Sequence, residues 1–281
     1  MTKEIEASPL FEKLNFAFVK LDEQGEPSAK WQNWETRLTS VIRKWTACEY
    51  HLDNVRLHKK TYNLHIKERV DQAATSGVGI EVEEIGHELS AFMAALKSGS
   101  DYLAELCIKY HLDGSTGDST KTILRLLKPE SRASSVLDAW KGFEGWLSES
   151  REYRHPLIHQ VSPRLKGGAI QNTSGGIEAV SIYPILVPQK PMRRSLDTRL
   201  SRMFEDPIDE PIGMMTGSKK VSLADENGGE KVLEYELLSK AGPGYVEIEE
   251  FLNTNLLQFE SLIVKVIGYV VDSGFRSSKS N

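Results

Sequence analysis

The chain has 281 residues, of which 40% are hydrophobic and 27% are charged, a composition typical of soluble globular proteins with a sizeable core. Its formal net charge of -5 excludes a uniformly basic protein that coats nucleic acid, so any such contact has to come from a local patch. The two cysteines, Cys48 and Cys107, suggest no disulfide framework, and no segment has the pattern of a signal peptide or a membrane span. We therefore expect a cytoplasmic protein that makes no contact with a membrane.

Helices dominate the predicted structure after an N-terminal arm or short strand over residues 1–30. Apolar residues spaced three and four apart predict helices over about 31–74, 82–112 and 119–127. A third main helix is expected to begin at the capping residue Ser134 or Ser135 and to continue into the segment around Arg154.

The pattern becomes that of strands after residue 162. The segment "GGIEAVSIYPILV" alternates apolar and polar residues, the turn "NGG" predicts a hairpin, and a last helix is expected from about Tyr245 to Val271. We expect an all-α fold, an antiparallel helical bundle with a small β-containing insertion before the last helix. The predicted organisation is an arm at 1–30, the bundle at 31–162, the insertion at 163–243, the C-terminal helix that completes the bundle at 244–274, and a disordered tail at 275–281.

Two motifs that resemble ligand sites fail on their spacing. The segment "GSTGDSTKT" lacks the glycine that a phosphate-binding loop has directly before its lysine, and a helix rather than a strand precedes it. His51, His58 and His65 are seven residues apart along one helix, so neighbouring imidazoles lie about 10 Å apart, too far for one metal ion. We expect neither a metal site nor a cofactor.

A loop between the predicted strands gathers five basic side chains. Such a patch can hold phosphates and is a candidate RNA-binding surface. The alternative is a solvated loop that is balanced by the acidic segment "EDPIDEP" after it. The five residues are Lys190, Arg193, Arg194, Arg199 and Arg202.

The strongest candidate site is the segment "REYRHPLIHQ". Pro156 has no backbone N–H and disfavours helical geometry at His155, so the helix should bend or pause here. In a straight helix Arg154 and His159 would project about 140° apart, whereas a bend could let both side chains converge on one point. The alternative is a plain helix end, where His159 caps the C-terminus and Arg154 pairs with a carboxylate such as Glu149.

This segment resembles the motif of the HEPN superfamily, the higher eukaryote and prokaryote nucleotide-binding domains. The motif is an arginine, usually followed by a polar residue, and then a histidine near the end of a helix in an all-α bundle. Arg154 and His159 have four residues between them, and His155 occupies the polar position, which is more often Asn or Asp. Leu157 and Ile158 before the histidine are also typical.

The resemblance covers about residues 31–162 and 245–272, and Pro156 departs from the pattern. It implies a metal-independent endoribonuclease, of a kind that often acts in toxin–antitoxin or phage-defence systems. By this resemblance, His159 is the general acid/base, Arg154 binds the phosphate, and His155 orients the substrate or tunes His159.

The resemblance also implies a homodimer in which two motifs face one groove. The implied ligand is RNA or a nucleotide, and an antitoxin is a candidate partner. Two alternatives stay open: a catalytically silent HEPN-like scaffold that binds a nucleotide, RNA or a protein, and a helical structural protein without a ligand.

Overall fold

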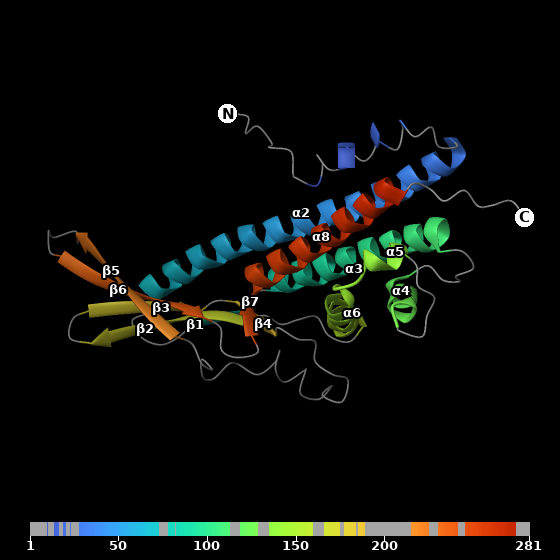
Figure 1. Ribbon diagram of the computed structural model, residues 1–281. Coiled ribbons are helices and arrows are strands. Elements are labelled where there is room, and N and C mark those ends of the chain that lie inside the picture. Colours follow the sequence, from blue (N-terminus) through green and yellow to red (C-terminus); the bar gives the residue numbers. More distant parts are fainter. Residues whose placement is uncertain are drawn as a thin grey trace, which may run out of the picture. The chain divides into compact units, whose positions relative to one another are not determined.

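A computed structural model describes the backbone of residues 10, 14–16, 19–20, 23, 28–72, 78–81, 83–112, 119–128, 135–159, 166–174, 177–183, 185–188, 215–224, 230–240 and 245–273 (Figure 1). Apart from a few N-terminal positions, side chains are described over 33–64, 83–112, 119–128, 136–154, 185–187, 246–270 and 272. The helices are α2 (Ser28–Gln72), α3 (Glu83–His111), α4 (Thr120–Leu126), α5 (Ser135–Asp138), α6 (Glu144–His159) and α8 (Ile248–Ser273). The strands are β1 (Val78–Glu81), β2 (Lys166–Ser174), β3 (Ile177–Tyr183), β4 (Leu186–Pro188), β5 (Met215–Ala224), β6 (Glu230–Lys240) and β7 (Tyr245–Glu247).

These elements confirm the predicted all-α class with a β-containing insertion before the last helix. The chain divides into two compact units: unit 1 holds residues 1–49, 93–151 and 254–281, and unit 2 holds residues 50–92 and 152–253. The boundaries fall inside α2, α3, α6 and α8, so each of these helices contributes residues to both units.

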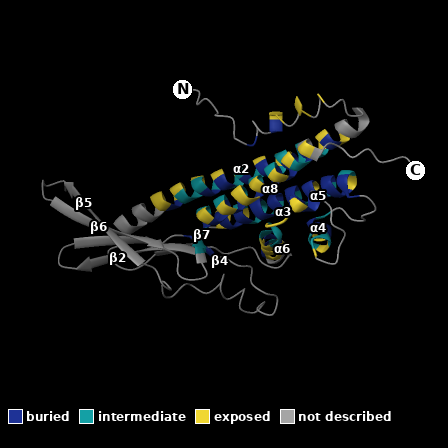
Figure 2. Cartoon of the chain, in the orientation of Figure 1, coloured by how far each residue is buried: buried dark blue, intermediate teal, exposed yellow. Residues whose placement is uncertain are grey.

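In unit 1, α2, α3 and α8 pack against one another around a closely approached glycine. A Cβ atom on Gly99 of α3 would lie 2.4 Å from the Phe259 ring of α8 and 3.0 Å from Cβ of Lys44 on α2. The apolar stripes of the three helices are buried in this unit, as Trp45, Leu96 and Phe259 illustrate. Figure 2 shows these buried stripes along the helices. The three-four spacing that predicts the helices therefore also identifies their buried faces.

The predicted third main helix is wrong in one respect, because a turn divides it into α5 and α6. Gly142 has φ 91°, a left-handed conformation that side chains with a Cβ rarely adopt. Its backbone N–H donates to Oε2 of Glu144 at 2.6 Å, so the first residue of α6 holds the turn. Trp140 is fully buried within this turn, which explains why the apolar pattern continues across the break.

The N-terminal region also differs from the prediction. Those residues between 10 and 23 that the structure describes are helical rather than extended, and Leu10 and Leu14 are buried. In α4 the predicted helix is confirmed, and its first backbone N–H is capped from elsewhere in unit 1. Oδ1 of Asp101 on α3 accepts from the backbone N–H of Thr120 at 3.1 Å and from its hydroxyl at 2.9 Å.

The β region of unit 2 contains a five-stranded sheet in the order β1-β2-β3-β6-β5. Neighbouring strands are antiparallel except for β3 and β6, which are parallel. The predicted hairpin is confirmed as β5 and β6, and the predicted alternating strand forms β3 and β4. The sequence patterns did not identify β1, a strand of four residues between α2 and α3 that pairs with β2.

The last helix begins three residues later than predicted. Residues Tyr245–Glu247 form β7, which pairs antiparallel with β4, and α8 begins at Ile248. The backbone N–H of Ile248 donates to the carbonyl of Ile185 at 2.9 Å, so the strand pairing ends directly at the first turn of the helix. In the part of the chain that the structure describes, no helix combines the length and apolarity needed to cross a membrane.

Candidate functional site

The predicted motif lies at the C-terminal end of α6, and the structure describes one of its three site side chains. Arg154 is described with its side chain, whereas His155 and His159 are described only as backbone within α6. The helix is assigned through Pro156 to His159, so the predicted pause at the proline does not occur. The predicted RNA-binding residues Lys190, Arg193, Arg194, Arg199 and Arg202 lie outside the described residues.

Packing against α8 holds this end of α6 in unit 2. Tyr153 is 6% exposed and its ring lies 4.7 Å from the Phe251 ring, measured between centroids. Burial raises the pKa of the Tyr153 hydroxyl far above its ordinary value, so it stays neutral. The aromatic contact fixes the helical turn on which the next residue, Arg154, is carried.

The side chain of Arg154 has one nitrogen without a hydrogen-bond partner among the residues that the structure describes. The residue as a whole is partly buried, and its Nε atom is sealed from solvent without a hydrogen-bond partner. Among the residues that the structure describes, it forms no ion pair, and the predicted alternative pairing with Glu149 is not among the ion pairs observed. A guanidinium stays protonated at any physiological pH, and a partly buried one without a partner is unfavourable.

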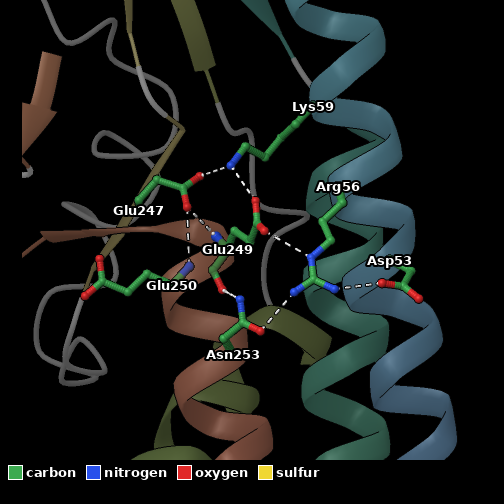
Figure 3. Close-up of polar contacts among 7 residues, drawn as sticks. All are labelled: Asp53, Arg56, Lys59, Glu247, Glu249, Glu250 and Asn253. Carbon is green, nitrogen blue, oxygen red and sulfur yellow. Dashed lines mark hydrogen bonds and ion pairs between the residues drawn. The ribbon is translucent and has the colours of Figure 1, made fainter. Parts of the chain in front are cut away.

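A second group of charged side chains in unit 2 differs from Arg154, because its members form ion pairs and hydrogen bonds with one another (Figure 3). Nζ of Lys59 on α2 donates to Oε1 of Glu247 at 2.6 Å and to Oε2 of Glu249 at 2.9 Å. Nε of Arg56 donates to Oε1 of Glu249 at 3.0 Å. We call this group the α2–α8 ion cluster; it consists of Asp53, Arg56, Lys59, Glu247, Glu249 and Asn253.

The remaining nitrogens of Arg56 are also satisfied. One Nη donates to Oδ1 of Asp53 at 2.8 Å, and the other donates to Oδ1 of Asn253 at 3.1 Å. Asn253 in turn donates to the backbone carbonyl of Glu249 at 2.8 Å. Every nitrogen of this guanidinium therefore has a partner, and two of the three partners come from the first two turns of α8.

The cluster also caps α8. Oε2 of Glu247 accepts from the backbone N–H groups of Glu249 at 2.9 Å and of Glu250 at 3.3 Å, which satisfies donors at the helix N-terminus. Glu247 thus acts as the N-cap residue, a position usually occupied by Ser, Thr, Asp or Asn. Negative charge at this end is also favoured by the helix dipole.

The pKa values in the cluster shift as its contacts require. Burial disfavours the charged ammonium of Lys59, but hydrogen bonds to Glu247 and Glu249 outweigh it and raise the pKa of Lys59. Burial likewise opposes the charge of Glu249, but hydrogen bonds from Lys59 and Arg56 prevail, and the pKa of Glu249 is lowered. Lys59 and Glu249 consequently stay charged at neutral pH, and their mutual pairing gives the cluster a structural role.

Of the three spaced histidines, His51 contacts a carboxylate on a neighbouring helix. Nδ1 of His51 lies 2.6 Å from Oε2 of Glu88 on α3, and the same carboxylate accepts from Nδ2 of Asn54 at 3.0 Å. This contact joins α2 to α3 within unit 2. The side chain of His65 lies outside the described residues.

Sequence reasoning missed the α2–α8 ion cluster. Its one local signal is the run of acidic residues "EIEE" directly before an apolar helical pattern, which is typical of a helix N-terminus. The basic partners are separated from it by 193 positions between Arg56 and Glu249, and no local pattern relates them.

No protein-family model, curated protein or solved structure gives a significant match to this chain. The HEPN resemblance consequently depends on the residues of the α6 motif alone.

Proposed function

We propose that the protein is a HEPN-like, metal-independent endoribonuclease that uses Arg154 and His159. The observation that carries this proposal is the partly buried guanidinium of Arg154, whose Nε has no hydrogen-bond partner. In this proposal a phosphate diester binds the outer nitrogens of the guanidinium, because guanidinium nitrogens bind phosphate oxygens in a planar, two-point geometry.

In the proposed reaction, the 2′-oxygen of a ribose attacks the adjacent phosphorus and the P–O5′ bond breaks. The imidazole of His159 takes the 2′-hydroxyl proton or returns a proton to the leaving 5′-oxygen, and Arg154 stabilises the charge on the phosphate oxygens. His155 orients the substrate or tunes His159. The products are a 2′,3′-cyclic phosphate and a free 5′-hydroxyl, and the step consumes no metal, cofactor or oxidant.

The continuity of α6 favours a site that is shared between two chains. If α6 stays regular to its end, Arg154 and His159 project about 140° apart, and a single chain does not bring them together. A homodimer would bring Arg154 of one chain beside His159 of the other, with two such sites in one groove. The basic residues between 190 and 202 would then guide RNA, and a toxin or defence role with an antitoxin partner fits this chemistry.

A silent scaffold is the second candidate, because a regular helix that separates Arg154 and His159 by about 140° also fits it. If the two side chains of the motif do not meet even in a dimer, Arg154 still offers a phosphate site without a general acid/base. Such a protein binds RNA or a nucleotide and does not cleave it.

The decisive experiment measures cleavage of single-stranded RNA by the full chain with a metal chelator present. Replacement of the imidazole in His159→Ala should lower the rate by about 10²–10⁴-fold, and Arg154→Ala should have an effect of similar size, about 10²–10³-fold. Arg151→Ala is the matched control, since Arg151 is an exposed arginine on the same helix. Cleavage that both motif variants retain would contradict the proposal, and binding that only Arg154→Ala weakens, without cleavage, would establish the scaffold.

Mixing the two inactive variants tests whether the site is shared. In heterodimers of the Arg154→Ala and His159→Ala chains, one of the two composite sites keeps both groups. An equal mixture should therefore recover about a quarter of the wild-type activity after subunit exchange. No recovery would place both groups of a site on one chain.

A further inference from the structure

Three large hydrophobic side chains form an exposed line on α2 in unit 2. Tyr50, Leu57 and Leu64 are 62%, 59% and 61% exposed, respectively. They are seven residues apart, so each step advances about 10 Å along the helix and turns only about 20° around it. We call these three residues the α2 outer stripe.

The outer stripe lies on the side of α2 that faces away from the core of unit 2. Leu52, Val55 and Tyr62 are buried, and in a regular helix they lie about 140–160° around the axis from Leu57. The same helix therefore has two apolar faces, one of which is covered. A line of apolar side chains with a seven-residue repeat is the pattern by which one helix packs along another.

The charges beside the stripe determine which occupant fits it. Asp53 and Lys60 are both exposed and lie on one flank, about 40° and 60° from the line of the stripe, whereas Asn54 and Thr61 lie on the other flank. When two identical helices pack antiparallel about a two-fold axis, equal flanks face each other. With Leu57 at the axis, Asp53 of each chain then lies about one residue along the helix from Lys60 of the other.

A parallel pair lacks these contacts, since opposite flanks then meet and each charged flank faces Asn54 and Thr61. The apolar side chains are also symmetric about Leu57 in the antiparallel pair, in which Tyr50 packs on Leu64 of the second copy. The apolar and the charged positions are thus both self-complementary in the antiparallel pair, but not in the parallel pair.

We propose that the α2 outer stripe is a docking surface for a second copy of this chain, packed antiparallel with Leu57 at the two-fold axis. Three side chains per chain are few compared with the roughly 1,200–2,000 Å² that stable interfaces bury, so the dimer is reversible, with a dissociation constant on the order of 10–100 μM. This inference uses residues of α2 alone and does not depend on the nuclease proposal.

The first test measures the mass of the full chain by sedimentation over a concentration series. Leu57→Lys places two ammonium groups at the axis and should weaken the dimer at least about tenfold. Leu257→Lys is the matched control, because Leu257 on α8 is equally exposed, at 62%, and lies off the stripe. A chain that stays monomeric up to several hundred μM would overturn the proposal. A dimer that Leu57→Lys leaves intact would also overturn it, because that dimer would use another surface, such as that of the α6 motif.

The second test determines the direction of packing. Tyr50→Cys and Leu64→Cys chains are mixed and treated with a short bis-maleimide; the native Cys48 and Cys107 are both fully buried and do not compete. The antiparallel arrangement should give a cross-link between the two different chains, in excess over links between identical chains. Preferential links between identical chains would indicate parallel packing and contradict the proposal.

The third test uses the flanking charges. Lys60→Glu places two carboxylates together across the axis and should weaken the dimer several-fold, whereas Lys60→Glu combined with Asp53→Lys restores opposite charges and should recover it. Because Asp53 also accepts from Arg56 within its own chain, urea denaturation first checks that the double variant is folded. If the double variant is no better than the single one, the antiparallel charge pairing is wrong.

Discussion

The α2–α8 ion cluster and the end of α6 each contain a partly buried arginine, but the two arginines differ in their hydrogen bonding. In the cluster, every nitrogen of Arg56 has a hydrogen-bond partner, and its neighbours Lys59 and Glu249 are also paired. At the end of α6, the Nε of Arg154 is sealed from solvent without a partner. Both regions pack against the first two turns of α8, one through Glu249 and Asn253 and the other through Phe251.

The difference separates a structural charge from a candidate functional one. A paired guanidinium contributes to stability and has no free donor for a ligand, whereas a buried donor without a partner costs stability. Under the proposed function, the unmatched arginine and not the region of high charge density marks the ligand site. Variants of the two arginines can test this distinction.

The largest effect is expected for Arg56→Met, which keeps the length of the side chain and removes its charge. It leaves Asp53 without its partner and leaves Glu249 with Lys59 alone. We expect the free energy of unfolding to fall by about 2 kcal/mol, less than for a fully buried pair because the Arg56 side chain is 40% exposed. Urea denaturation measures this loss. The matched control is Arg43→Met on the same helix, where the arginine is exposed and the change should stay within about 0.5 kcal/mol. Equal effects of the two variants would mean that the cluster does not stabilise the fold.

A smaller loss is expected for Glu247→Ala, which removes the cap of α8 and one partner of Lys59. Loss of an N-cap costs about 1 kcal/mol, and the partly exposed ion pair adds little. Glu250→Ala is the control, since Glu250 occupies the same helical turn and is exposed. If denaturation shows the same small loss for both variants, Glu247 acts only through the helix dipole and not as a cap.

The pH dependence of stability should show the lowered pKa of Glu249. Because hydrogen bonds from Lys59 and Arg56 outweigh burial, the folded pKa lies below the ordinary value of 4.5, so the unfolded chain takes up the proton first as the pH falls. The contribution of Glu249 is therefore complete above about pH 4.5 and is lost as the pH falls through the folded pKa. The stability gap between wild type and Glu249→Gln should narrow over this window. A gap that stays constant down to pH 3 would mean that Glu249 is not held as a carboxylate.

The long helices and their buried faces could be predicted because each is encoded by residues three and four apart. Leu52 and Val55 show this for α2, and both are buried as their spacing requires. The break before α6 could not be predicted in this way, since buried Trp140 continues the apolar pattern through a turn that depends on Gly142. A positive φ at a glycine has no periodic signature in the sequence.

The candidate site was predictable only in part, for a related reason. The spacing of Arg154 and His159 is a local property, so the motif can be identified from the sequence. The pairing state of Arg154 is a property of the folded surroundings, as is the cap that Glu247 provides once β7 pairs with β4. Long-range contacts of this kind decide which charges are structural, and local patterns do not encode them.

The smallest effect on stability is expected for Arg154→Met. This variant tests most directly whether Arg154 differs from the structural Arg56. Because Nε of Arg154 has no partner to lose, replacing the guanidinium with an apolar chain of similar length should leave the free energy of unfolding unchanged or raise it by up to about 1 kcal/mol. The proposed nuclease activity should nevertheless fall as far as in Arg154→Ala, since both variants lack the phosphate-binding group. Stability is measured by urea denaturation beside Arg56→Met, and activity by RNA cleavage. A loss of stability as large as that of Arg56→Met would show that Arg154 is a structural arginine like Arg56. The reason for regarding the α6 motif as a ligand site would then be removed.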